Sequence, residues 1–108
     1  MGAENSETIA RYRKLLEQFP NHELARFSLG KAWYDSGDYG AARDEFELAL
    51  ARKPDWMAVQ ILLGRCELAL GNQRRAREIF ERARQLAIEQ DHRGPLAEVE
   101  QLLSELAR

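Results

Sequence analysis

Residues 23–56, ELARFSLGKAWYDSGDYGAARDEFELALARKPDW, align without a gap with residues 57–90, MAVQILLGRCELALGNQRRAREIFERARQLAIEQ. Eight positions are identical at this offset of 34 residues: Leu29/Leu63, Gly30/Gly64, Gly37/Gly71, Ala42/Ala76, Arg43/Arg77, Phe46/Phe80, Glu47/Glu81 and Ala49/Ala83. The turn signals Pro20-Asn21 and Pro54-Asp55 recur at the same offset. A period of this length is typical of a stacked supersecondary unit, so the sequence predicts a helical repeat protein.

Each repeat has the pattern of two antiparallel amphipathic helices joined by a tight turn. A proline ends the preceding helix, and the next residue, Asn21 or Asp55, has a side-chain oxygen that can cap the following one. Gly37 and Gly71 can adopt the left-handed conformation that ends a helix, with a capping residue directly after each. Gly30, inside a helix, costs about 1 kcal/mol relative to Ala, so we expect the paired helix to approach closely there.

Composition and charge argue against several classes of function. The net charge is −2, which gives no long-range positive field for nucleic acid or an anionic membrane. No apolar run approaches the roughly 20 residues of a spanning helix, and the first residues lack the basic-then-apolar order of a signal peptide, so export is not expected. The one cysteine, Cys66, cannot form an internal disulfide, which fits the cytoplasm. Residues 1–6 match the loose pattern for acylation of Gly2. The alternative interpretation of this segment is a polar leader without a lipid.

The first repeat resembles the tetratricopeptide repeat family. Its matching residues are Leu29-Gly30, Trp33-Tyr34, Gly37-Asp38-Tyr39, Ala42, Phe46, Ala49-Leu50 and Pro54. Residues 56–90 resemble a second, more degenerate repeat, and residues 7–19 resemble the second helix of a truncated preceding one. The resemblance implies one domain over residues 1–108, with the first full repeat at 22–54. The expected fold is all-α, a right-handed superhelical solenoid of antiparallel helix pairs with about six helices.

The sequence departs from the family pattern at three positions. Arg26 and Gln60 stand where the family usually has a large apolar residue, and Glu67 replaces the usual aromatic. No proline closes the second repeat, so we expect its last helix to run on toward Asp91. Residues 95–107 then carry an apolar stripe and are predicted to form a capping helix over the open end of the stack.

In this family the first helices of successive repeats line a concave face on which a partner peptide lies. Carried onto this chain, the resemblance gives a candidate peptide-binding groove made by Leu24, Phe27, Lys31, Tyr34, Ile61, Arg65 and Leu68. Spacings of three and four residues independently place Phe27, Lys31 and Tyr34 on one helix face. We therefore predict a protein-interaction adaptor or chaperone-like module, with another protein or peptide as its partner.

Two alternatives stay open at this point. The chain's own C-terminal helix could fill the apolar positions of the groove, leaving the cations solvated. A self-assembling structural module is the second, with a homodimer formed through the groove or the ends of the solenoid. The polar clamp that some family members use for a partner's terminal carboxylate is not expected, because Phe27, Ser28, Ile61 and Leu62 stand in its place.

The remaining polar residues do not form a pattern typical of catalysis. His22 and His92 are the only histidines and have no second ligand at metal spacing, so no metal or other cofactor is predicted. Cys66 falls in register with Ala32 and is interpreted as a small buried thiol. The arginines of residues 74–84 are interrupted by Glu78 and Glu81 and lack a stacking platform for nucleic acid. We predict no enzyme activity.

Overall fold

Residues 2–107 form six α-helices and no strand in the computed structural model, which describes these residues and the side chains from residue 5 onward. The helices are α1 (Gly2–Gln18), α2 (Glu23–Asp35), α3 (Tyr39–Arg52), α4 (Met57–Ala69), α5 (Gln73–Glu89) and α6 (Arg93–Leu106). The predicted all-α solenoid of antiparallel helix pairs is confirmed. The acylation pattern at Gly2 requires removal of Met1, which lies outside the described residues.

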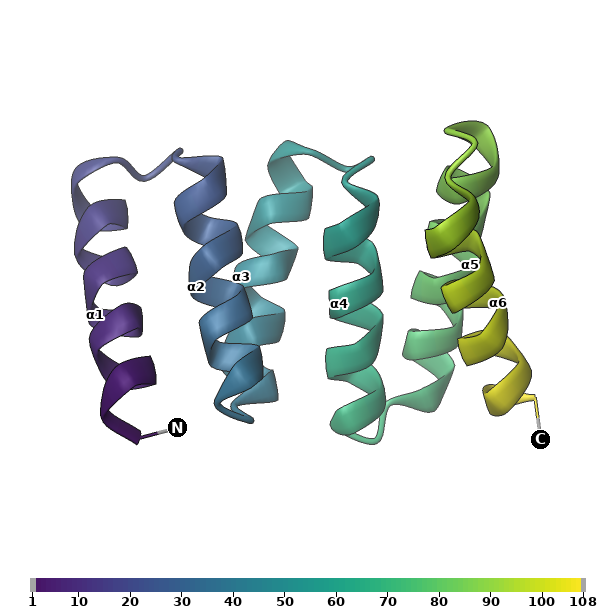
Figure 1. Ribbon diagram of the computed structural model, residues 1–108, viewed down its shortest axis with the longest axis horizontal. Helices are drawn as coiled ribbons and strands as arrows, with labels where there is room; N and C mark the ends of the chain where they lie inside the picture. Colours follow the sequence, from purple (N-terminus) through teal and green to yellow (C-terminus); the bar gives the residue numbers. More distant parts are fainter. Residues whose placement is uncertain (1, 108) are drawn as a thin grey trace.

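The helices stand side by side in a row, and each packs mainly against its neighbours in the chain (Figure 1). The row measures 40 × 26 × 21 Å. α2, α4 and α6 form one layer and α3 and α5 lie behind it, with α1 at one end (Figure 1). No helix within residues 2–107 is both long and apolar enough to cross a membrane.

The core is divided into three apolar clusters along the row rather than gathered in one centre. The first joins α1 to α2 through buried residues that include Ile9 and Leu29. The second joins α3 to α4 around Phe46, and the third joins α4, α5 and α6 around Phe80. Each helix pair therefore depends on the next pair to complete its burial, as stacked repeats require.

The glycines inside α2 and α4 allow a phenylalanine ring of the paired helix to lie on the helix backbone. A Cβ atom added at Gly30 would lie 2.6 Å from Cε1 of Phe46, and one at Gly64 would collide with Phe80 in the same way. Both rings are fully buried. The close approach predicted from the sequence is confirmed, and its cause is a ring seated on each glycine.

The turns after α2, α4 and α5 share one geometry. Gly37 and Gly71 have φ of 84° and 85°, and Asp91, a non-glycine residue, has φ of 54° at the third turn. In each case the next residue donates its N–H to a carbonyl five positions earlier, at 3.0 Å for Asp38 to Trp33, as in a Schellman motif. α5 therefore ends at Glu89 instead of running on to Asp91.

Helix capping differs from the sequence prediction at several ends. Asp38 caps α3 by accepting the N–H of Ala41 at 3.2 Å, as expected. The prediction that Asn21 and Asp55 cap the next helices was wrong, because α2 and α4 start one residue later. His22 is the N-cap of α2 and accepts the N–H of Ala25 through Nδ1. The corresponding residue at α4, Trp56, makes no side-chain cap.

The terminal helices also extend further than predicted. α1 begins at Gly2, five positions before the expected Glu7. α6 begins at Arg93, two positions before Pro95, which lies in its first turn. A proline is tolerated there because the first N–H groups of a helix have no partner within it.

The polar residues at family-apolar positions have specific partners. Arg26 donates to the carbonyl of Pro20, and Gln60 donates to that of Pro54. The equivalent position in each repeat thus makes the same hydrogen bond to the turn that precedes its helix. Arg26 also pairs with Glu45 at 2.7 Å. These side chains therefore replace apolar packing with a tether between a helix and the turn before it.

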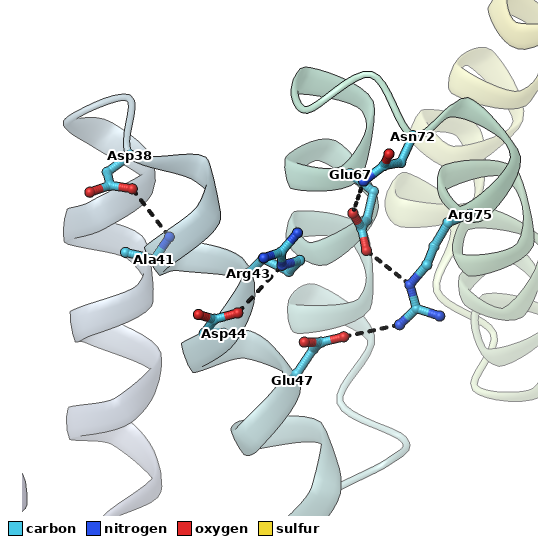
Figure 2. A network of polar contacts seen from close by, with 8 residues as sticks. All are labelled: Asp38, Ala41, Arg43, Asp44, Glu47, Glu67, Asn72 and Arg75. Atoms are coloured by element: carbon cyan, nitrogen blue, oxygen red, sulfur yellow. Dashed lines mark hydrogen bonds and ion pairs between the residues drawn. The ribbon is translucent and has the colours of Figure 1, made fainter.

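Glu67, which replaces an aromatic residue, is 2% exposed and lies in a polar network (Figure 2). Its carboxylate accepts from Asn72 Nδ2 at 2.8 Å and from Arg75 Nε at 2.9 Å. Arg75 also donates to Glu47 of α3 at 3.1 Å, and the bond to Glu67 raises the pKa of the guanidinium. The side chain of Asn72 thus bonds to Glu67 and does not cap α5.

Candidate functional site

The residues of the predicted groove occupy equivalent places on α2 and α4, counted from their N-caps His22 and Trp56. Leu24, Phe27, Lys31 and Tyr34 lie on α2, and Ile61, Arg65 and Leu68 lie on α4. The structure treats the two sets differently.

In the α2 part of the predicted groove the two aromatic residues pack on other rings of the chain, whereas Leu24 and Lys31 are exposed. The ring of Phe27 stacks on Trp56 with centroids 5.3 Å apart, and Tyr34 meets Tyr39 edge-on at 5.4 Å. Lys31 pairs with Asp35 on its own helix at 3.0 Å. The Phe27–Trp56 stack thus joins α2 to the N-cap of α4, and the Tyr34–Tyr39 contact joins α2 to the start of α3. Leu24, in the first turn of α2, is 65% exposed.

The α4 part is packed from the side of α6. Ile61 is 6% exposed and belongs to the cluster that contains Val99 and Leu102 of α6. Leu68 packs against the same cluster. The chain's own C-terminal helix thus covers part of these two side chains, as one of the alternatives had it. Arg65 Nη2 reaches across to Glu98 Oε2 of α6 at 2.6 Å.

An open groove of about 780 Å³ lies between α4 and α6 and the turns that precede them. Its lining consists of Lys53, Asp55, Trp56, Met57, Ala58, Ile61, Leu62, Arg65, Gln90, His92, Pro95 and Glu98. The volume is within the range of ligand-binding clefts, and five of the twelve lining residues have large apolar side chains or a proline ring. Of the seven predicted residues, Ile61 and Arg65 line this groove.

Sequence reasoning missed most of the lining, in particular Trp56, Leu62 and the two residues of α6, Pro95 and Glu98. Trp56 is an aromatic residue just after a proline turn and offered a local signal. Pro95 and Glu98 offered none, because α6 lies outside the 34-residue repeat.

Both positive and negative side chains line the groove, namely Lys53, Arg65, Asp55 and Glu98. Lys53 Nζ lies 5.0 Å from the ring centroid of Trp56, a cation–π distance. α4 and α6 both begin at the groove, and neither has a side-chain cap, so N–H groups with partial positive charge lie at its rim. Burial raises the pKa of the Tyr34 phenol, and the nearby Arg65 guanidinium opposes that shift.

Cys66, the one thiol of the sequence, does not line the groove. Cys66 is fully buried, and burial together with Glu67 raises the pKa of its thiol to about 12. A neutral, covered thiol is a poor nucleophile. Within the described part of the chain, no group of three or more His, Cys, Asp or Glu side chains is placed to hold a metal ion.

Sequence comparison identifies the family. Two family models described as tetratricopeptide repeat match residues 5–56 and residues 34–106. A TPR repeat-containing protein of Pseudomonas aeruginosa, PA0015, is 32% identical over 87 residues, which are 81% of each chain. The chain belongs to the tetratricopeptide repeat family.

Solved structures agree with this assignment. Protein BPP2914 from Bordetella parapertussis matches 93% of this tetratricopeptide repeat protein with 26% identity and a TM-score of 0.83, over 87% of its own chain. The TPR2B domain of yeast Sti1, in a complex with pHsp70, matches 97% of it with 15% identity and a TM-score of 0.86, over 84% of its own chain. At 15% identity the likeness to Sti1 establishes the shared fold alone.

Proposed function

We propose that this tetratricopeptide repeat protein is a non-enzymatic interaction module that binds a peptide segment of another protein in the groove between α4 and α6. The observation that carries the proposal is the groove itself, an open cleft of about 780 Å³ between α4 and α6 that is partly lined by apolar side chains. Apolar walls with a few charged groups suit a peptide that buries its side chains while its backbone stays near solvent. The Sti1 neighbour, whose structure is a complex with pHsp70, supports the idea that this fold holds polypeptides.

Within this proposal the seven residues predicted from the sequence have different roles. Ile61 forms part of the floor and Arg65 a charged wall. Tyr34 and Leu68 extend the surface along the same helix faces, and Leu24 and Lys31 lie on the exposed side of α2. Phe27 acts indirectly, by supporting Trp56 through the stacked contact.

A homodimer formed through the groove or the ends of the solenoid is the weaker candidate. Gly30 and Gly64 are each the eighth residue after an N-cap, and the eighth residue of α6 is Glu100, which is exposed. If a helix of a second copy stacked on α6 as α3 stacks on α2, its phenylalanine would meet the Glu100 side chain where Phe46 meets the bare backbone of Gly30. The polar C-terminal end therefore suits a cap more than a stacking surface.

The single buried thiol, Cys66, is compatible with a reducing compartment, and we place the protein in the cytoplasm on that basis.

Phage display with the purified protein, followed by fluorescence anisotropy with the selected peptides, tests the proposal. Leu62→Ala removes an apolar wall of the groove and is expected to weaken peptide binding about tenfold, since a lost leucine contact of this size is worth roughly 1–3 kcal/mol. Leu48→Ala is the matched control, because Leu48 is 51% exposed on α3 and does not line the groove.

Equal affinities for the Leu62→Ala and Leu48→Ala variants would refute the groove as the binding site. Sedimentation velocity with and without peptide separates the two candidates. A monomer at all concentrations supports the interaction module, whereas a dimer supports self-assembly. Dissociation of that dimer on Leu62→Ala would mean contact through the groove, and a dimer unchanged by this variant would mean contact through the ends of the solenoid.

A further inference from the structure

Arg65 is the charged side chain that spans the groove, and its guanidinium is only partly engaged. Nη2 donates to Glu98 at 2.6 Å, while Nε and Nη1 make no hydrogen bond within the described part of the chain. The side chain is 35% exposed and that of Glu98 is 43% exposed. An ion pair this open to solvent favours the paired over the unpaired arrangement by a factor of only about two to five. An incoming carboxylate can therefore compete with Glu98 for the Arg65 guanidinium, or bind it at the same time.

The same protein contains an arginine that holds two carboxylates at once. Arg75 donates through Nε to Glu67 at 2.9 Å and through Nη2 to Glu47 at 3.1 Å. In Figure 2 the two acidic side chains approach this guanidinium from different helices. Arg65 has the same nitrogens but one acidic partner, so it has N–H donors left for a second acceptor, and the residue lines the groove.

The surroundings of Arg65 define the chemistry that would fit beside it. Trp56, Ile61, Leu62 and Pro95 line the groove with apolar surface. The complementary ligand is therefore a carboxylate flanked by apolar side chains. Glu98 has this context itself, because Leu96 and Val99 are its near neighbours in sequence.

We propose that Arg65 binds a carboxylate of the partner peptide, and that the groove therefore selects segments in which an Asp or Glu side chain lies between apolar residues. This inference rests on the proposed function and adds the identity of the recognised group. Glu98 keeps the guanidinium extended across the groove, and its own negative charge weakens the binding of a second carboxylate. Glu98 is thus a positioning residue that tunes affinity.

The probes are two sets of fluorescein-labelled synthetic peptides with apolar side chains on both sides of one central residue. The central residue is Glu in one set and Gln in the other. Anisotropy titrations at low and at high salt give the affinity of each set for the wild-type protein and for the variants Arg65→Gln, Glu98→Gln and Glu100→Gln.

Arg65→Gln is expected to weaken the binding of Glu peptides about tenfold or more, because a charge-assisted hydrogen bond is lost, and to leave the Gln peptides unchanged. Glu98→Gln keeps a hydrogen-bond acceptor but removes the charge, and should tighten Glu peptides about two- to fivefold. Glu100→Gln is the matched control, because Glu100 lies on α6 and pairs with Arg84 at 3.5 Å outside the groove. High salt should weaken the Glu set alone.

The proposal is overturned if Arg65→Gln affects both peptide sets equally, or neither, while Leu62→Ala still weakens binding. It is also overturned if Glu98→Gln has no more effect on Glu peptides than Glu100→Gln. Peptide binding that is insensitive to Leu62→Ala, or a failure of both sets to bind the wild-type protein, is instead a failure of the proposed groove, and the inference falls with it.

Discussion

Gly30→Ala should destabilise the protein although it improves the intrinsic helix propensity of α2. The propensity gain is about 1 kcal/mol. Against it, the new Cβ would lie 2.6, 2.8 and 3.1 Å from three ring carbons of Phe46. That ring is fully buried, so any shift of it must be taken up by side chains packed around it. Overpacking of this kind costs typically 1–3 kcal/mol and more where nothing can move. At a separation of 2.6 Å we take the upper part of this range, about 2–3 kcal/mol, which leaves a net loss of about 1–2 kcal/mol in the free energy of unfolding, or about 5–10 °C in Tm.

Urea titration followed by far-UV circular dichroism measures this change, and two further variants make the test specific. Gly40→Ala is the control, because Gly40 is also in a helix and a Cβ there meets nothing within 4 Å; this variant should be neutral or slightly stabilising. In the double variant Gly30→Ala/Phe46→Leu the smaller side chain should recover part of the loss, which a double-mutant cycle detects. A higher urea midpoint for Gly30→Ala, as for Gly40→Ala, would show that the Phe46 ring is not seated on this helix.

Three further predictions concern the other polar and capping features. Glu67→Ala should lower the free energy of unfolding by about 1–2 kcal/mol in urea titration, because two hydrogen bonds to a buried carboxylate are lost and the freed Arg75 is half-exposed and can be solvated. Asp38→Ala should cost about 1 kcal/mol in the same assay through loss of the cap on Ala41, and an unchanged midpoint would contradict the capping bond. Native Cys66 should resist alkylation by iodoacetamide at neutral pH. Because burial raises its pKa from 9.0 to about 12, the thiol ionises first in the unfolded chain, so the free energy of unfolding should fall as pH rises through this interval. A Cys66→Ala variant with the same pH dependence would refute that explanation.

The sequence predicted the helix pairs because they are specified by short-range signals that occur twice. Gly37 and Gly71 end helices through a backbone conformation that glycine adopts at little cost, and Asp38 caps the next helix within three residues. Gly30 recurs as Gly64 at the same offset, which predicted a close approach of the paired helix but not that Phe46 makes the contact. Signals of this kind need no knowledge of distant parts of the chain.

The candidate groove was harder to predict because its shape depends on contacts between elements distant in sequence. The stacking of Phe27 on Trp56 joins two different repeats, and periodicity within a single helix carries no information about it. The ion pair of Arg65 with Glu98 joins positions 33 residues apart, one of which lies in a helix outside the repeat. The end of α5 was predicted wrongly for a different reason. Asp91 adopts a left-handed conformation that its residue type alone favours only weakly.

Each helix packs mainly against its neighbours in the chain, and this arrangement also determines how the molecule carries mechanical load. α4 and α6 have few direct backbone contacts and both rest on α5, so the groove walls are connected mainly through one helix. A pull between the two ends of the 40 Å row passes through every helix interface in series. Each interface then takes up a small fraction of the extension, as the coils of a spring do, before any single helix has to unwind.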